Sequence, residues 1–234
     1  MNLLARLADD PTRAAIFLDI DGTLAPIVPR PEDARVPTET RAELRRLQSR
    51  YALVACISGR AGADARRIVD VPELVYVGNH GLELDPEAPL WRDRLRSVLA
   101  TIEWPETEDK GLSVSLHYRN VADEAAARTS LESIADRARA QGFDARFGRK
   151  VLEILPPLAN KGAAVDRLLA DRGLQRALYA GDDTTDLDAF AALDSLELGV
   201  RVAVVSKEVP TALAEAADIV VADPAELVGV LRKL

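Results

Sequence analysis

The stretch FLDIDGTLAPI, Phe17–Ile27, decides the expected fold, because a short apolar run ends there in two aspartates and a glycine. It belongs to the run AAIFLDIDG, Ala14–Gly22, and the same form recurs in ALVACISGR, Ala52–Arg60, and in RALYAGDD, Arg176–Asp183. Short, continuously apolar runs that end at glycine or aspartate are typical of buried parallel strands. Helical patterns alternate with these runs, so the sequence predicts an α/β fold with a doubly wound parallel sheet.

The same sheet should contain further strands, with helices between them. The first helix is expected to follow Pro37 and to use Thr38 as its N-cap. The expected helices are Thr38–Tyr51, Ala61–Val69 and Lys161–Arg172, and the further strands are Leu198–Val205 and Asp218–Val221, each followed by a helix.

The middle of the chain has a different pattern. LSVSLHYR, Leu112–Arg119, alternates apolar and polar residues, as strands of an antiparallel sheet with one open face do. The expected order is a helix at Leu90–Ile102, this strand, a helix at Ala122–Ala140 and two strands, the last at Lys150–Pro156. Prolines bound the segment, so residues 85–156 are predicted to form a small α+β domain inserted into a core of residues 1–84 and 157–234.

The composition argues against several classes of protein. The 234 residues are 48% hydrophobic and 29% charged, with a net charge of −8, which disfavours binding to nucleic acid or to an anionic membrane. No run approaches the roughly 18 apolar residues of a membrane span, so a cytoplasmic protein, monomeric or weakly oligomeric, is expected. Cys56 is the only cysteine and His80 and His117 are the only histidines, so a bound metal would need oxygen ligands.

Two aspartates at the end of the first strand are the first candidates for chemistry. Ligands of open α/β sheets bind at the carboxyl ends of strands, where Asp19 and Asp21 are expected. One carboxylate there can attack phosphorus, and the other can protonate the leaving oxygen and then activate water. Thr23 can offer a hydroxyl and an amide after the turn at Gly22. The alternative is that the aspartates only cap a turn.

Three further motifs carry groups suited to a phosphoryl ligand. SGR, Ser58–Arg60, offers a hydroxyl and amides, and Lys161 places a cation at the start of a helix. Taken alone, SGR is more often a common turn, and a lone lysine at such a position is usually a solvated surface charge. The carboxylates of Gly181–Asp186 would repel one another without a cation, and this favours a Mg²⁺ site over a helix cap formed by Asp183 or Thr184.

Taken together in this order, the four motifs resemble those of the haloacid dehalogenase superfamily of phosphotransferases, and the insert resembles its type-2 cap. A narrower similarity, to the trehalose-6-phosphate phosphatase family, covers nearly the whole chain. It rests on FLDIDGTLAPI, NHGLE (Asn79–Glu83), KGLSVSLHYRN (Lys110–Asn120), VLEILP (Val151–Pro156) and GDDTTDLDAF (Gly181–Phe190).

The resemblance implies a sugar-phosphate substrate and a two-step hydrolysis. Asp19 is then the nucleophile and Asp21 the acid and base, while Ser58, Thr23 and Lys161 neutralise the phosphoryl oxygens. The implied Mg²⁺ ligands are Asp19, the backbone carbonyl of Asp21, and Asp182, with Asp183 and Asp186 around them. The implied substrate contacts are Gly59 and Arg60 in the core and Glu108, Lys110, Asn120 and Glu153 in the cap.

Some positions depart from the family pattern, and these leave the identity of the sugar open. They are Leu155, where the family often has a basic residue, Leu187, where an acid is usual, and Asn79, where a small residue is commoner. The alternatives are a phosphatase for another sugar phosphate, a phosphomutase, and a non-catalytic partner of a trehalose-phosphate synthase. The last is disfavoured because this chain retains all the catalytic acids. His117 and Arg119 are either sugar contacts or an exposed strand face, His80 is expected to be structural, and Cys56 should lie in the core.

Overall fold

The computed structural model describes residues 2–148, 150–205 and 211–234, and the chain divides into two compact units. The first comprises residues 1–81 and 160–234, and the second comprises residues 82–159. The segment 85–156, predicted as an insert, falls within the second unit. Gly81 and Asn160, where the chain leaves and re-enters the first unit, are close neighbours: a Cβ atom at Gly81 would lie 2.6 Å from the carbonyl oxygen of Asn160.

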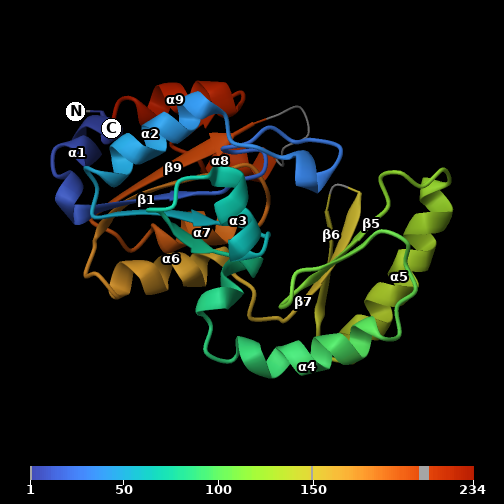
Figure 1. Cartoon of the computed structure of the whole chain (residues 1–234). Helices are drawn as coiled ribbons and strands as arrows, with labels where there is room; N and C mark the ends of the chain where they lie inside the picture. Colours follow the sequence, from blue (N-terminus) through green and yellow to red (C-terminus); the bar gives the residue numbers. More distant parts are fainter. Residues whose placement is uncertain (1, 149, 206–210) are drawn as a thin grey trace. The chain divides into compact units, whose positions relative to one another are not determined.

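The first unit is built on a six-stranded parallel sheet in the order β10-β9-β8-β1-β2-β3. Figure 1 labels β1 and β9 of this sheet. β1 is central, because β2 and β3 follow on one side and β8, β9 and β10 on the other. The strands are β1 (Ala14–Leu18), β2 (Leu53–Ile57), β3 (Val75–Val77), β8 (Arg176–Gly181), β9 (Leu198–Val204) and β10 (Ile219–Val221). The α/β prediction with a doubly wound parallel sheet is therefore confirmed.

Helices cover both faces of this sheet, as parallel strands require. They are α1 (Leu3–Ala8), α2 (Thr38–Gln48), α3 (Gly62–Val69), α6 (Lys161–Ala170), α7 (Asp186–Ala192), α8 (Thr211–Ala216) and α9 (Pro224–Leu231). Short 3₁₀ segments occur at Pro11–Arg13 and Pro31–Asp33, and the 3₁₀ turns of Asn79–Leu84 are separated by a kink with positive φ at His80 and Gly81.

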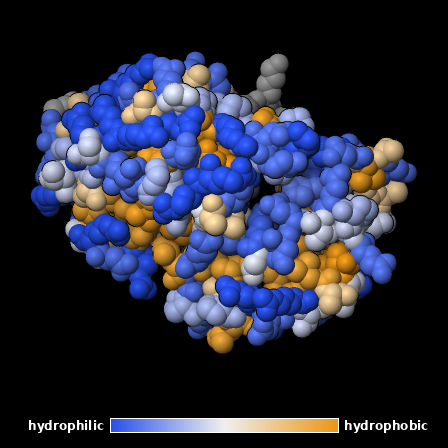
Figure 2. All heavy atoms as spheres, in the orientation of Figure 1, coloured by the Kyte–Doolittle hydropathy of each residue, from blue (hydrophilic) through white to orange (hydrophobic). Residues whose placement is uncertain are grey.

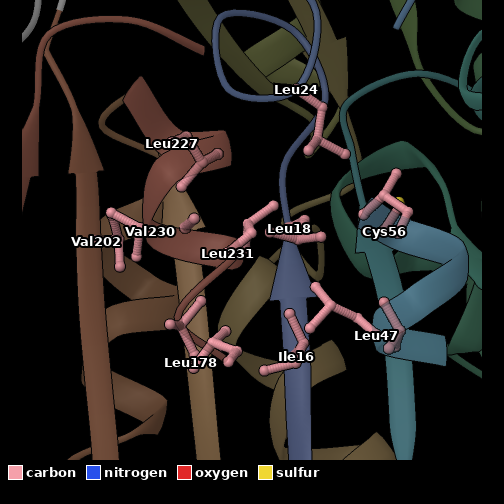
Figure 3. Close-up of a cluster of buried hydrophobic side chains, with 14 of the residues drawn as sticks. Ile16, Leu18, Leu24, Leu47, Cys56, Leu178, Val202, Leu227, Val230 and Leu231 are labelled. Carbon is pink, nitrogen blue, oxygen red and sulfur yellow. The ribbon is translucent and has the colours of Figure 1, made fainter. Parts of the chain in front are cut away.

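Alternate residues of the central strands point to opposite layers of the core. Ile16, Leu18 and Leu178 pack with Leu47 of α2 and Leu231 of α9 in one apolar cluster (Figure 3). On the other side of β8, the ring of Tyr179 meets that of Phe190 in α7 edge to face, with 6.0 Å between centroids. Burial on both faces explains why these strands are uninterrupted apolar runs in the sequence.

The second unit is an antiparallel sheet, ordered β4-β5-β7-β6, with two helices on one face. Its elements are α4 (Ala88–Leu99), β4 (Thr107–Asp109), β5 (Val114–His117), α5 (Glu124–Ala140), β6 (Asp144–Gly148) and β7 (Val151–Leu155). Val114 and Leu116 of β5 and Leu152 and Ile154 of β7 pack against both helices. The intervening residues of these strands point to the other face.

Several local expectations were wrong. The N-cap of α2 is Pro37, which makes no side-chain cap hydrogen bond, and Thr38 is the first helical residue instead. A proline pre-sets the extended backbone that precedes a helix, so the cap position moved by one residue. The insert also has one strand more than expected, β4. It was not predicted because it is only three residues long and carries mostly polar side chains.

The surface follows the composition. Polar side chains cover most of the face shown in Figure 2, and apolar ones occur there in smaller groups. The large apolar side chains that are exposed in the described residues are Ile27, Leu90 and Val220. Within the described residues, no helix has the length and apolar character needed to cross a bilayer.

Candidate active site

The site forms where β1 ends, between its two neighbours β2 and β8. Leu18, the last residue of β1, is paired with Cys56 of β2 and Ala180 of β8. The backbone N–H of Asp19 then donates to the carbonyl of Ala180 at 2.9 Å, which continues the pairing by one residue. The motifs that follow β1, β2 and β8 therefore meet at one edge of the sheet, at the point where the strand order reverses.

The turn after Asp19 is closed by its own backbone. The carbonyl of Ile20 accepts hydrogen bonds from the amides of Thr23, Leu24 and Ala25. Gly22 has a φ of 82°, in the left-handed region that favours glycine, and a Cβ atom there would lie 2.0 Å from Oδ2 of Asp182. A glycine is required at this position because any side chain would collide with that aspartate.

Lys161 connects two carboxylates inside this edge. Its Nζ lies 2.7 Å from Oδ1 of Asp186 and 3.1 Å from Oδ2 of Asp19, and the lysine is 2% exposed. Lys161 is the first residue of α6, whose N-cap Asn160 accepts from the amide of Ala163. A helix N-terminus repels a cation, so the two carboxylates are what keep the ammonium group there.

Asp186 acts as the hub of the hydrogen bonds in this cluster. Its Oδ1 also accepts from the hydroxyl of Tyr179 at 2.7 Å, and its Oδ2 accepts from the amides of Asp182 and Asp183, each at 2.9 Å. Both oxygens are thus occupied by donors, and the carboxylate orients Lys161. Sequence reasoning missed Tyr179; its signal was a phenol in the middle of a buried strand, where a hydroxyl needs a partner.

The electrostatics of the cluster favour a cation. Burial raises the pKa of Asp19 to about 7, against the lowering effect of Lys161. Burial, with the charges of Asp19 and Asp186, raises the pKa of Asp182 to about 9. Burial opposes the charge of Lys161, but the two carboxylates outweigh it and raise the pKa of this lysine. Three carboxylates therefore face one ammonium group, and the excess negative charge is unfavourable without a further cation.

The donor set fits a hard divalent ion. Asp19, Asp182 and Asp186 each offer an oxygen, and these three atoms lie within 4.8 Å of one another. Because both oxygens of Asp186 already accept hydrogen bonds, Asp19 and Asp182 are the carboxylates suited to hold the ion. The hydroxyl of Thr23 donates to Oδ1 of Asp182 at 3.4 Å, which places Thr23 beside the same group.

The SGR motif after β2 has a different environment. Ser58 is 1% exposed, and its hydroxyl oxygen accepts from the amide of Arg60 at 3.2 Å. A Cβ atom at Gly59 would lie 2.6 Å from Nε2 of His80, so that imidazole packs directly on the motif. The guanidinium of Arg60 points to Asp21 and Asp64. Burial alone would lower the pKa of Arg60, but these two carboxylates raise it above its usual value.

The remaining acid of the fourth motif stays within its own turn. Oδ1 of Asp183 accepts from the amide and the hydroxyl of Thr184. The first residue of α7 is Asp186 and its N-cap is Thr185, which makes no side-chain cap bond. Neither residue proposed as an alternative cap therefore occupies that position, and the contact with Lys161 comes from Asp186.

In the second unit, the polar candidates lie on the face of the sheet opposite α4 and α5. Glu108, Ser115, Glu153 and Arg146 are neighbours in register across its four strands. Nζ of Lys110 lies 2.8 Å from Oε1 of Glu153.

The neighbours of this row differ in character. Nε2 of His117 lies 2.9 Å from Oε2 of Glu108, so the histidine contacts the polar row. Asn120 contacts Glu106 through its amide nitrogen. Leu155 is fully buried in an apolar cluster with Leu82 and Leu112, which explains the absence of a basic residue there.

The comparisons with known proteins agree with this fold. The family model described as trehalose-phosphatase matches residues 17–104 and 91–224. A probable trehalose-phosphate phosphatase 2 of Oryza sativa subsp. japonica is 32% identical over 95% of this chain and 68% of its own length. A trehalose-phosphate phosphatase of Mycobacterium avium is 36% identical over 76% of this chain and 51% of its own length.

Some relatives are much longer than this chain. An uncharacterized glycosyl hydrolase of Mycobacterium tuberculosis is 36% identical over 81% of the chain, but only 16% of its own length is covered. Two solved structures give the fold. A trehalose-6-phosphate phosphatase related protein is 25% identical with a TM-score of 0.69, over 93% of this chain and 95% of its own. A haloacid dehalogenase-like hydrolase from Bacteroides thetaiotaomicron is 17% identical with a TM-score of 0.63, over 94% and 98%.

This chain has a parallel sheet with an acidic cluster at its switch point, and its fold is similar to that of the solved haloacid dehalogenase-like hydrolase. The match extends to the narrower level, since the family model covers most of the sequence in both units. The chain belongs to the trehalose-phosphatase family, whose members hydrolyse phosphoric monoesters.

Proposed function

We propose that this protein is a Mg²⁺-dependent phosphatase that hydrolyses trehalose 6-phosphate to trehalose and phosphate. The observation that carries the proposal is the buried cluster in which Lys161 contacts Asp19 and Asp186 beside Asp182. Such a cluster offers a carboxylate nucleophile, a cation for the phosphoryl oxygens and oxygen ligands for a hard metal ion. The names of the relatives support the choice of substrate.

Asp19 is the proposed nucleophile. Lys161 contacts one oxygen of its carboxylate and thereby restricts the rotation of the group. In the first step an oxygen of Asp19 bonds to phosphorus, the bond from phosphorus to the sugar oxygen breaks, and that oxygen takes a proton from Asp21. In the second step a water molecule attacks the phosphorus of the aspartyl-phosphate and gives a proton to Asp21. The bond between phosphorus and Asp19 breaks, phosphate is released, and the carboxylate of Asp19 is regenerated.

Asp19, Asp182 and the backbone carbonyl of Asp21 are the groups we assign to hold Mg²⁺. The ion would supply positive charge to the phosphoryl oxygens, a role that dominates catalysis of phosphoryl transfer. Ser58 and Thr23, with the amides of Gly59 and Arg60, are assigned to the remaining phosphoryl oxygens. Asp183 and Asp186 are assigned to orient the groups that surround the ion and the phosphoryl group, such as Lys161.

The polar row of the second unit is proposed to recognise the sugar. Hydroxyl groups of a disaccharide need both acceptors and donors, and Glu108 and Glu153 with Lys110 provide them. Asn120 belongs to the same proposed set, although its amide contacts Glu106. Because Leu155 leaves an apolar side chain at one family position, a different sugar phosphate is the alternative substrate.

The proposal is tested by phosphate release from trehalose 6-phosphate and from a panel of other sugar phosphates. We expect the highest kcat/KM for trehalose 6-phosphate, loss of activity in EDTA and recovery with excess Mg²⁺. Asp19→Asn should abolish turnover while the circular dichroism spectrum stays unchanged. Near-normal turnover by that variant would contradict the nucleophile, and a better substrate in the panel would contradict the sugar.

A further inference from the structure

Arg60 joins the proposed acid and base to a second carboxylate of the first unit. Its Nε lies 2.6 Å from Oδ2 of Asp21 and its Nη2 lies 2.8 Å from Oδ1 of the same residue. Its Nη1 donates to Oδ2 of Asp64 at 2.8 Å. Each of the three guanidinium nitrogens thus donates to a carboxylate, and both oxygens of Asp21 are held by one planar fork.

The guanidinium group of Arg60 is itself held in place by its surroundings. The side chain of Arg60 is 9% exposed, whereas that of Asp21 is 33% exposed. Asp64 is held in turn by Arg67, whose Nη2 lies 2.6 Å from its Oδ1. The backbone carbonyl of Arg60 also accepts from the amide of Asn79 at 2.7 Å. The more exposed partner is therefore oriented by the more buried one.

We propose that the side chain of Arg60 is a positioning group that sets the direction of the Asp21 carboxylate for proton transfer, and that its guanidinium does not bind the phosphoryl group of the substrate. The inference rests on the proposed function. A carboxylate has about four acceptor positions, and the fork uses one on each oxygen, so Asp21 keeps acceptor positions for a proton of the attacking water. A single point charge at this position would not fix the plane of the carboxylate.

The experiment separates the two chemical steps with p-nitrophenyl phosphate. Its nitrophenolate leaves without a proton, so the first step does not need Asp21, whereas the second step still needs a base for the water. In Arg60→Lys and Arg60→Met we expect a burst of about one nitrophenolate per active site, because the aspartyl-phosphate accumulates. The steady-state rate should then fall by about tenfold to a hundredfold.

Binding of phosphate distinguishes positioning from substrate contact. If Arg60 only positions Asp21, the KM for trehalose 6-phosphate and the inhibition constant of inorganic phosphate should stay near the wild-type values in both variants. A large rise in both constants with an unchanged kcat would overturn the inference and make Arg60 a phosphate ligand. Wild-type steady-state rates without a burst would overturn it as well.

Two neighbours supply controls that do not touch Asp21. Arg67→Ala removes a contact to Asp64 only and should retain wild-type rates. Asp64→Asn loosens one side of Arg60 and should give a smaller fall in rate than Arg60→Lys, which also covers the case in which an Arg60 variant does not fold. Wild-type enzyme that turns over p-nitrophenyl phosphate but not trehalose 6-phosphate would contradict the substrate alone, and the burst would still decide the role of Arg60.

Discussion

Tyr179 is a residue whose importance depends on one hydroxyl group. It is fully buried, and its hydroxyl donates to Asp186, the carboxylate that also contacts Lys161. In Tyr179→Phe, Asp186 loses a donor while remaining buried. Because hydrogen bonds to charged groups contribute about 1.5–3 kcal/mol, we expect a loss of that size in the free energy of unfolding, with a lower kcat.

The matched control is Tyr76→Phe, which removes a hydrogen bond to the neutral carbonyl of Val71. Urea unfolding should show a loss of only about 1 kcal/mol for this variant. Equal losses in the two variants, with kcat unchanged in both, would contradict the special role assigned to Tyr179.

Gly22 offers a second prediction at the scale of a single residue. In Gly22→Ala the new Cβ atom would lie 2.0 Å from Oδ2 of Asp182, so the turn or that carboxylate must move. We expect loss of turnover and of the stabilisation by Mg²⁺ in thermal unfolding. Gly173→Ala is the control, because Gly173 also has a positive φ, 63°, but nothing lies within 4 Å of its Cβ position. This control should lose stability and keep its activity.

The sequence predicted single residues of the site better than their partners. Asp19, Lys161 and Asp182 were predictable because charged residues at the ends of buried strands or at the start of a helix need a reason to be there. The pairing of Arg60 with Asp21 was not, because it depends on how the loops after β1 and β2 approach each other. The same applies to Tyr179, which the pattern shows only as part of an apolar run.

At the scale of elements, strands β4 and β7 carry two of the proposed sugar contacts, Glu108 and Glu153. Glu153 contacts Lys110 and lies on the polar face of the sheet. We expect Glu153→Ala to lower kcat/KM for trehalose 6-phosphate by about tenfold or more, as loss of a charged hydrogen bond of about 1.5–3 kcal/mol implies. Activity on p-nitrophenyl phosphate, which has no sugar, should change little.

A matched control lies on the same unit, in an element that is not part of the polar row. Glu132 on α5 pairs with Arg128 on the surface, so Glu132→Ala should leave both activities unchanged. If Glu153→Ala lowered turnover of the two substrates equally, its role would be general and not specific to the sugar.

The elements themselves were predictable in proportion to their length and periodicity. β1, β2 and β8 are buried on both faces, and an uninterrupted apolar run leaves few alternatives. β3 and β4, with three residues each, were not predicted, although the equally short β10 was; both pair along the edge of a neighbouring strand. The ends of the helices differ from the predicted ends by a few residues, because helix caps depend on local backbone geometry.

At the scale of the whole molecule, the acidic cluster should make stability depend on pH. Burial raises the pKa of Asp19 to about 7 and that of Asp182 to about 9, both from 3.8. Above pH 4 the unfolded chain has released these protons, while the folded protein still binds them. Folded protein therefore binds more protons, and its stability falls as the pH rises from about 4 to about 9.

Thermal unfolding in EDTA between pH 5 and 9, in about 0.1 M salt to limit surface charge effects, checks this dependence. Asp182→Asn stays neutral and should unfold at a temperature that falls less steeply with pH than that of the wild type. Added Mg²⁺ should raise the wild-type unfolding temperature more at high pH, because the ion competes with protons for the same oxygens. Parallel pH profiles for the two proteins would show that Asp182 does not titrate in this range.

The neighbouring positions of Gly81 and Asn160 bear on how such proteins diversify. Both ends of residues 82–159 join the larger unit at neighbouring positions, so for the larger unit the insert is equivalent to a loop whose two ends lie close together. The entropic cost of closing such a loop grows only slowly with its length. Segments of very different size and shape can therefore be exchanged at this junction, and a lineage can acquire new specificities by replacing one module while the chemistry at the sheet edge is inherited intact.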